Sequence, residues 1–345
     1  MILGLFTGLF GAGGIQTICR HVALVLDAYA RQARTTVSML SLLDTEITSS
    51  LGGNYSDGDQ ECLSSIRGYS GNRLHFALAA VARGFHSRII VCGHVNLSPL
   101  AWLLRWMRPD MDYIVVAYGI EVWGPLPLIL RKALQQADHV IAISKFTANQ
   151  ITEQHHVDPR HVRVIHPTID PDWDSDIGQI EHESPLLLSV TRLEETEKYK
   201  GVDSVIRALP EICTRHRNIK YVIVGEGSDR ARLESLGESL GVHQHIRFLG
   251  ALQGRALRDW YLRSTLFVLP SQGEGFGVVF LEAMALGKPV IAGSYGGSQE
   301  IVVHGESGYL VDHGNQEALV GAISRLLDDQ SLCMRMGERG RRRFL

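Results

Sequence analysis

Short apolar runs alternate along the chain with longer stretches whose apolar positions recur at helical spacing. In the second half, one such stretch follows LLLSVTR and carries Val202, Val205, Ile206 and Leu209. The next two strand and helix pairs open with YVIVGEG and LFVLP, and Gly287 can end the second helix before KPVIAG. Strands and helices that alternate in this way predict a parallel sheet covered by helices.

The first half of the chain shows the same alternation. Its strand candidates are MILGLF, RIIVCGH, YIVVAYG and HVIAIS, whereas residues 44–72 are polar and poorly patterned and predict a mobile loop. The periodicity fails near residues 167–185, where prolines and acids accumulate. With 345 residues, two domains of about 170 residues each are expected. The fold class is therefore α/β, with two Rossmann-like doubly wound domains (1–168 and 186–345) facing each other across a cleft and a linker at 169–185.

Charge and cysteine content narrow the function classes. The 34 basic and 37 acidic residues nearly balance, which argues against a nucleic-acid partner and favours a small molecule. Five scattered cysteines without CxxC or Cys/His spacing support neither a disulfide framework nor a zinc site. Residues 1–19 carry no charge and are broken by glycines, which is typical of a buried strand entering a glycine loop rather than a signal peptide. A cytoplasmic protein fits these features.

Two acids stand out in FVLPSQGEGFGVVFLEAMALGKPVIAG. Glu274 lies in the loop after a strand, the position where parallel α/β sheets bind ligands, and Gly275 and Gly277 allow a ligand to approach the backbone. The first amides of the following helix favour phosphate or sugar oxygens. Glu282 lies on an almost wholly apolar helix, where a carboxylate requires a cation or ligand hydroxyls. An internal salt bridge and a ligand diol remain equal alternatives for Glu282 on this argument.

Further candidate chemistry has an ordinary structural alternative in each case. Arg192 and Lys200 can hold a leaving diphosphate at the same edge of the sheet, or they can pair with the acids between them. FGAGGIQTICRH is a glycine-rich turn into a helix but lacks the third glycine of a dinucleotide fingerprint. DPDWDSD spaces Asp170, Asp172, Asp174 and Asp176 as a DxD metal site would, although a solvated acidic loop is the simpler interpretation.

Two predicted helices lie in the first half of the chain. Ser144 follows HVIAI and is most simply a helix N-cap. LSPLAWLLRWMRP, residues 97–109, combines Leu, Trp and Arg as an interfacial membrane helix does. A core helix with two outward arginines is the alternative.

Taken together, these motifs resemble glycosyltransferase family 4, a group of GT-B enzymes, over nearly the whole chain. The most specific motif is E-x7-E from Glu274 to Glu282, supported by GGIQ, ADHVIAISKFT, Arg192 with KG, VGEG and GGSQEIV in the family's order. The resemblance implies retaining, metal-independent transfer of a hexose from a GDP- or UDP-linked donor held by the C-terminal domain. It implies no cofactor, because the nucleotide-sugar is a substrate, and it implies a glycan, polysaccharide or lipid-linked acceptor. The cysteine pattern favours a cytoplasmic location, and the helix at residues 97–109 adds peripheral contact at the cytoplasmic membrane face as an alternative.

The resemblance also assigns roles to residues by position. Arg192 and Lys200 hold the diphosphate, Glu274 contacts donor sugar hydroxyls, and Glu282 accepts from the ribose diol. The remaining contacts with sugar, phosphate or base are assigned to Gly13, Gly14, Leu252, Gly275, Phe276, Gly277 and Val278.

The chain departs from the family pattern in two places. AYGIEVW places Tyr118 where relatives have a catalytic histidine, and a phenol is a poorer proton shuttle near neutral pH. His94 follows another strand and can compensate. A family helix that crosses back onto the first domain is expected beyond MGERGRRR, where this sequence stops at Leu345. An alternative function is therefore a nucleotide-sugar-binding protein with impaired turnover.

Overall fold

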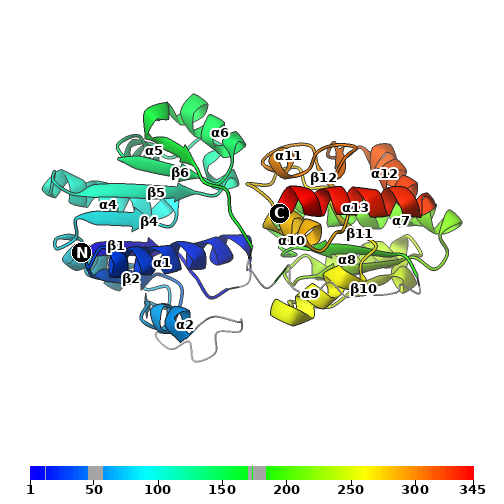
Figure 1. Cartoon of the computed structure of the whole chain (residues 1–345), viewed down its shortest axis with the longest axis horizontal. Coiled ribbons are helices and arrows are strands. Elements are labelled where there is room, and N and C mark those ends of the chain that lie inside the picture. Colours follow the sequence, from blue (N-terminus) through cyan, green and yellow to red (C-terminus); the bar gives the residue numbers. More distant parts are fainter. Residues whose placement is uncertain (12, 46–56, 170–172, 174–183) are drawn as a thin grey trace. The chain divides into compact units, whose positions relative to one another are not determined.

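The computed structural model describes residues 1–11, 13–45, 57–169, 173 and 184–345. The chain divides into two compact units, Met1–Pro167 and Thr168–Leu345. Each unit is a parallel sheet with helices packed on it (Figure 1). Most of the predicted linker, residues 170–172 and 174–183, lies outside the described residues, as do Asp170, Asp172, Asp174 and Asp176 of the acidic run.

Unit 1 has a seven-stranded sheet in the order β3-β2-β1-β4-β5-β6-β7. Its strands are β1 (Ile2–Phe6), β2 (Val37–Ser41), β3 (Arg67–Gly68), β4 (Ile89–Cys92), β5 (Asp112–Ala117), β6 (His139–Ala142) and β7 (Val162–Val164). Its helices are α1 (Gly14–Gln32), α2 (Asp57–Ser64), α3 (Arg73–Gly84), α4 (Ser98–Met107), α5 (Leu128–Gln135) and α6 (Lys145–His155). All five residues of β1 are buried, as predicted for a strand entering the glycine loop. Ser144 caps α6 by accepting from the Thr147 amide at 3.1 Å, which confirms its predicted role.

Unit 2 has a six-stranded sheet in the order β10-β9-β8-β11-β12-β13. Its strands are β8 (Leu186–Val190), β9 (Lys220–Val224), β10 (Ile246–Phe248), β11 (Leu266–Leu269), β12 (Val290–Gly293) and β13 (Gly308–Val311). Its helices are α7 (Val202–Arg215), α8 (Arg230–Ser239), α9 (Gly254–Arg263), α10 (Val278–Ala285), α11 (Ser298–Ile301), α12 (Gln316–Asp328) and α13 (Gln330–Phe344). The predicted apolar stripe of α7 is buried, and α10 ends before Gly287 as expected. Figure 1 shows α13 lying alongside α10.

The predicted loop over residues 44–72 is wrong for two segments, because α2 and β3 form there. The helix α2 packs against α1, where the Cys62 thiol lies 3.9 Å from the Ala23 carbonyl oxygen. Of its residues, Cys62 and Leu63 are buried core positions. Because α2 has so few apolar positions within a polar segment, its sequence shows no recognisable helical periodicity. The strand β3 is too short to show an alternation of apolar and polar residues.

Candidate functional site

The two sheets share one topological feature. In each sheet the first strand of the unit pairs with the fourth, β1 with β4 and β8 with β11, and the strand order reverses between them. Ligands of open parallel α/β sheets bind outside the carboxyl ends of the strands at such a reversal. The loops that follow β1, β4, β8 and β11 are therefore the candidate ligand-binding loops.

In unit 2, Lys200 and Glu274 meet at the reversal point. Lys200 ends the 3-10 segment η5 (Glu195–Lys200) after β8, and Glu274 lies in the loop after β11. The Lys200 Nζ donates to Glu274 Oε1 at 2.7 Å, and the two side chains are only 16% and 11% exposed. Burial is the largest single influence on the Lys200 ammonium and would lower its pKa, but the charge and hydrogen bond of Glu274, together with Tyr199 and Glu197, raise the pKa above its ordinary value. Lys200 is therefore a fixed positive charge in a nearly dry position.

Arg192 follows β8 but forms an ion pair with Glu197. This pairing with an intervening acid is the ordinary structural alternative, and it leaves the Arg192 side chain about half exposed. The loop of Arg192 is held by the glycines of VGEG: a Cβ on Gly225 would lie 1.8 Å from the Thr191 oxygen and one on Gly227 2.2 Å from the Leu193 oxygen. The motif thus supports the Arg192 loop by close backbone packing.

The loop from Glu274 to Gly277 delivers the chain into α10. It is fixed to the loop after β12, because the Gly297 amide donates to the Glu274 carbonyl oxygen at 2.7 Å. A Cβ on Gly297 would lie 2.3 Å from the Gly275 oxygen, so the two loops are in direct backbone contact. No side chain caps the start of α10. The amides of Phe276, Gly277 and Val278 therefore surround a positive helix end close to Glu274.

Glu282 has a partner that the sequence analysis missed. The hydroxyl of Tyr261, a buried residue of α9, donates to Glu282 Oε2 at 2.6 Å. Tyr261 stacks on Phe267 with ring centroids 5.5 Å apart and meets Trp173 edge to face at 5.3 Å. Burial and the Glu282 charge raise the pKa of Tyr261 well above its ordinary value, so this phenol stays a donor. The carboxylate of Glu282 is thereby held in one orientation by a rigid aromatic cluster.

Leu252 and Ser271 follow two strand ends of unit 2, those of β10 and β11. Leu252, predicted to contact a base, is half-buried in the loop after β10, two strands from β8. Ser271, which sequence reasoning did not single out, follows β11 and is buried with a hydroxyl that has no hydrogen-bond partner among the described residues. Its place directly after a strand of the reversal point was the available signal.

Unit 1 brings the glycine loop and His94 to its own reversal point. Gly13 and Gly14 follow β1 and begin α1, and His94 follows β4. The His94 Nδ1 accepts from the Asn96 amide at 3.1 Å. Burial lowers the pKa of the His94 imidazole despite the nearby charge of Glu121. A neutral imidazole therefore lies at this edge near neutral pH.

Tyr118 lies after β5 and is 3% exposed. Its hydroxyl donates to the Gly93 carbonyl oxygen at 2.9 Å and lies 3.1 Å from the Cys19 thiol of α1. Burial raises the pKa of the phenol well above its ordinary value. Its ring centroid is 6.1 Å from that of His94. Tyr118 thus directs its proton into the unit and packs beside the imidazole.

Within the described part of the chain, no group of three or more His, Cys, Asp and Glu side chains could hold a metal ion. The expectation of metal-free chemistry remains a prediction. No described helix is long and apolar enough to cross a membrane.

Comparison with known proteins matches both units. Residues 172–343 match the model described as glycosyl transferases group 1, and residues 59–173 match glycosyltransferase family 4. A GDP-mannose-dependent alpha-(1-6)-phosphatidylinositol monomannoside mannosyltransferase of Mycolicibacterium smegmatis is 31% identical over 266 residues, covering 71% of this chain and 69% of that one. An uncharacterized glycosyltransferase of Methanocaldococcus jannaschii is 35% identical over 203 residues. That match covers 55% of this chain and spans about half of the archaeal relative, 51%.

Solved structures share the fold at low identity. The structure of Anabaena Alr3699/HepE in complex with UDP-glucose superimposes with a TM-score of 0.78 at 18% identity, covering 100% of this chain and 94% of that one. At such identity the likeness concerns the fold alone. The predicted GT-B class of two Rossmann-like units is confirmed.

Proposed function

This chain belongs to glycosyltransferase family 4, the glycosyl transferases of group 1, and from that premise we propose that unit 2 binds a nucleotide-sugar whose hexose is transferred to an acceptor. The observation that carries the proposal is the Lys200 and Glu274 pair at the reversal point of the unit 2 sheet. A buried cation beside a positive helix end suits a diphosphate, and a buried carboxylate suits sugar hydroxyls.

Each site residue then has a role in transfer. Lys200 stabilises the charge that develops on the leaving diphosphate, and the amides of Phe276, Gly277 and Val278 add to that stabilisation. Glu274 accepts from sugar hydroxyls, and ligand binding draws part of its bonding away from Lys200. Arg192 changes partner from Glu197 to phosphate. Glu282, oriented by Tyr261, accepts from the ribose diol.

We propose that the reaction retains the anomeric configuration and needs no metal, since Lys200 and the helix amides provide the positive charge. The relatives support two donor classes: the M. smegmatis protein is named for GDP-mannose and the Anabaena structure holds UDP-glucose. The M. smegmatis protein is also named for phosphatidylinositol monomannoside, a phosphate-bearing lipid. A phosphate-bearing or lipid-linked acceptor is therefore the class we propose here.

The test of donor use is a thermal-shift screen of UDP-, GDP- and ADP-sugars, followed by transfer and hydrolysis assays on each sugar that binds. Binding of a ligand to the folded state raises the melting temperature. Lys200→Ala should reduce donor turnover by at least about 100-fold, the scale on which one electrostatic stabiliser acts. Lys198→Ala, which removes the exposed lysine two residues earlier, is the control. Equal turnover in Lys200→Ala and Lys198→Ala would reject the assignment.

The alternative is a nucleotide-sugar-binding protein with impaired turnover. It holds if the unaltered protein consumes none of the donors while a nucleotide still raises its melting temperature. The Tyr118 position favours that alternative, because the phenol proton is already engaged with Gly93.

Unit 1 presents a surface that suits an anionic membrane. On α4, Leu103 and Met107 are exposed and Trp106 is 80% exposed, and on the adjacent α3 Leu74 and Leu78 are exposed. Residues 62–109 contain six arginines and no aspartate or glutamate. Arg105 and Arg108 pair with acids beyond this range, so the cationic character of the face depends on the others, such as Arg73 and Arg83 of α3. Apolar side chains next to cationic ones insert at the interface of anionic bilayers. We propose peripheral contact through this α3–α4 face.

Sedimentation with phosphatidylglycerol vesicles tests this contact. Trp106→Ser should lower the bound fraction several-fold, whereas Met334→Ser, at an exposed apolar position of α13, should not. Binding should weaken with salt. Equal loss in both variants, or equal binding to phosphatidylcholine vesicles, would contradict the proposal.

A further inference from the structure

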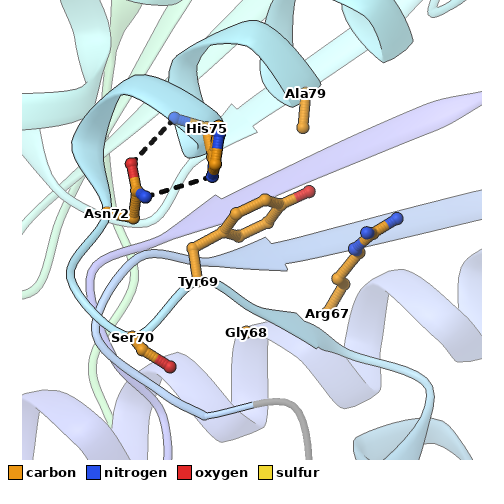
Figure 2. Close-up of a pocket in the computed structure, with 7 residues that line it drawn as sticks. All are labelled: Arg67, Gly68, Tyr69, Ser70, Asn72, His75 and Ala79. Carbon is orange, nitrogen blue, oxygen red and sulfur yellow. Dashed lines mark hydrogen bonds between the residues drawn. The ribbon is translucent and has the colours of Figure 1, made fainter.

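A pocket of about 490 Å³ opens in unit 1 between the end of β3 and the first turns of α3 (Figure 2). Its volume lies in the range of about 300–1,000 Å³ that is usual for small-molecule sites. The lining residues are Arg67, Gly68, Tyr69, Ser70, Asn72, His75 and Ala79. The Tyr69 amide donates to the Ser41 oxygen at the end of β2, at 3.0 Å. The pocket therefore lies at the carboxyl ends of the strands, beside the edge strand β3 and two strands from the reversal between β1 and β4.

Tyr69 provides a hydroxyl that needs a partner. Its oxygen is buried without a hydrogen-bond partner among the described residues. The ring packs edge to face on Phe76, with centroids 5.6 Å apart. Figure 2 shows this hydroxyl on the side of the ring that faces Arg67 and Ala79. Native structures rarely leave a buried hydroxyl unpaired, so a ligand oxygen is the natural partner.

The pocket is cationic. Arg67 lies with its guanidinium carbon 5.7 Å from the centre of the Tyr69 ring, and His75 lines the opposite wall. The Asn72 side chain accepts from the His75 amide at 3.1 Å and its nitrogen lies 3.0 Å from His75 Nδ1. With the amide nitrogen as donor, the ring proton of His75 is on Nε2 and can be donated to a ligand.

The lining residues include no aspartate or glutamate. The floor of the pocket is bonded to Asp44, whose carbonyl oxygen accepts from the Ser70 amide at 2.9 Å. Its carboxylate is turned to the β1 loop, where it accepts from the Leu9 amide at 2.8 Å and the Ser41 hydroxyl at 2.5 Å. Asp44 therefore joins the pocket floor to the segment that leads into Gly13 without placing negative charge in the pocket.

We propose that this pocket binds the phosphate or carboxylate group of the acceptor. The inference rests on the proposed function and adds the place in unit 1 where the anionic group of the acceptor is recognised. Arg67 provides the planar fork of donors that suits such oxygens, and the Tyr69 hydroxyl donates a further bond. The hydrogen bond between Asp44 and Leu9 connects the pocket to the loop that follows β1. Gly13 and Gly14 lie at the far end of that loop.

Site-resolved NMR of the full chain tests the pocket. Inorganic phosphate and malonate are titrated separately, and the amide signals of Gly68 and Ser70 are followed. Saturable shifts with either anion are expected, and the tighter anion identifies phosphate or carboxylate recognition. Arg67→Gln should weaken the fitted affinity at least about tenfold and Tyr69→Phe about three- to tenfold. Arg88→Gln, at an exposed arginine of the same acid-free stretch that does not line the pocket, should leave it unchanged. The retained fold of each variant is read from the other amide signals.

Three outcomes would overturn the proposal: shifts that grow linearly without saturation for both anions, equal affinity in Arg67→Gln and Arg88→Gln, or saturable shifts at other amides with none at Gly68 and Ser70. Failure of the proposed function looks different. If Lys200→Ala leaves donor turnover intact while the pocket still binds anions, sugar transfer at unit 2 is rejected and the anion site stands. If donor turnover depends on Lys200 but neither anion shifts Gly68 or Ser70, the anion site alone is rejected.

Discussion

Lys200 and Glu274 are 74 positions apart in the sequence, yet their side chains form a 2.7 Å ion pair across the strand reversal of unit 2. Both side chains are largely removed from water, so each charge depends on the other. The pair therefore keeps both charges in place at the carboxyl ends of β8 and β11.

The pair predicts a stability effect separate from catalysis. Lys200→Met leaves the Glu274 carboxylate buried and unpaired, which should lower the free energy of unfolding by about 3–5 kcal/mol. Glu274→Gln leaves the ammonium unpaired and should also destabilise. The double variant has no orphaned charge, so urea unfolding should give a loss clearly smaller than the sum of the single losses. Additive losses would show that the two charges do not depend on each other.

Tyr261 is expected to govern nucleotide affinity through Glu282. Tyr261→Phe removes the hydroxyl that donates to Glu282 Oε2 and so weakens the orientation of that carboxylate. A hydrogen bond to a charged group contributes about 1.5–3 kcal/mol, so nucleotide affinity measured by calorimetry should fall about tenfold or more. Tyr221→Phe is the matched control, since this buried hydroxyl of the same unit lies 2.8 Å from the Ser189 oxygen instead. A loss of equal size in both variants would contradict a specific role of Tyr261.

Gly297 is predicted to be required for the shape of the Glu274 loop. Its φ of −70° suits any residue, but a Cβ there would lie 2.3 Å from the Gly275 oxygen. Gly297→Ala should therefore push the loop away, lowering both the melting temperature and donor affinity. Gly321→Ala in α12 is the control, because a Cβ there meets nothing within 4 Å. That change should stabilise by about 0.5–1 kcal/mol through the better helix propensity of alanine.

The parts of the fold and of the site that could be predicted from the sequence are those that local patterns of residues encode. The apolar runs of β1, β8 and β11 and the helical spacing of α7 are local patterns, and they predicted the α/β fold correctly. The two-residue strand β3 has no period to recognise, which is why it was missed. Glu274 was placed correctly after β11 because a strand end is also visible locally.

Partners of the site residues required the tertiary structure. The pairing of Lys200 with Glu274 follows from β8 and β11 being neighbours, which the order of strands along the chain does not reveal. Tyr261 belongs to a different helix from Glu282, so no spacing rule connects them. The Tyr69 pocket depends on a short edge strand inside a segment whose composition predicts a loop.

Tyr118 is expected to position its neighbours rather than to transfer a proton. Tyr118→Phe removes a hydrogen bond to Gly93 and should cost about 1 kcal/mol of stability. A direct general acid or base contributes about 10²- to 10⁴-fold, so a transfer rate within tenfold of the unaltered protein would agree with positioning. His94→Gln should cause the larger fall in rate, because His94 lies at the reversal point of unit 1. The opposite ranking would restore Tyr118 as a catalytic residue.

Lys288 predicts how stability changes with pH. Its ammonium donates to the Leu262 oxygen at 2.7 Å, and burial lowers its pKa to about 8. The ordinary value of about 10.4 applies to the unfolded chain. Between these two values the folded state has lost the proton and the unfolded state still holds it, so the Lys288 contribution to the unfolding free energy rises with pH. Below pH 8 the folded state bears the full cost of a buried charge.

The Lys288→Met variant has no charge to bury, so it should be the more stable protein at pH 7.5. Its excess free energy of unfolding over the unaltered protein, measured by urea unfolding, should shrink by an amount on the order of 2 kcal/mol between pH 7.5 and pH 10. A difference between the two proteins that is the same at both pH values would mean that Lys288 titrates alike in the folded and unfolded states.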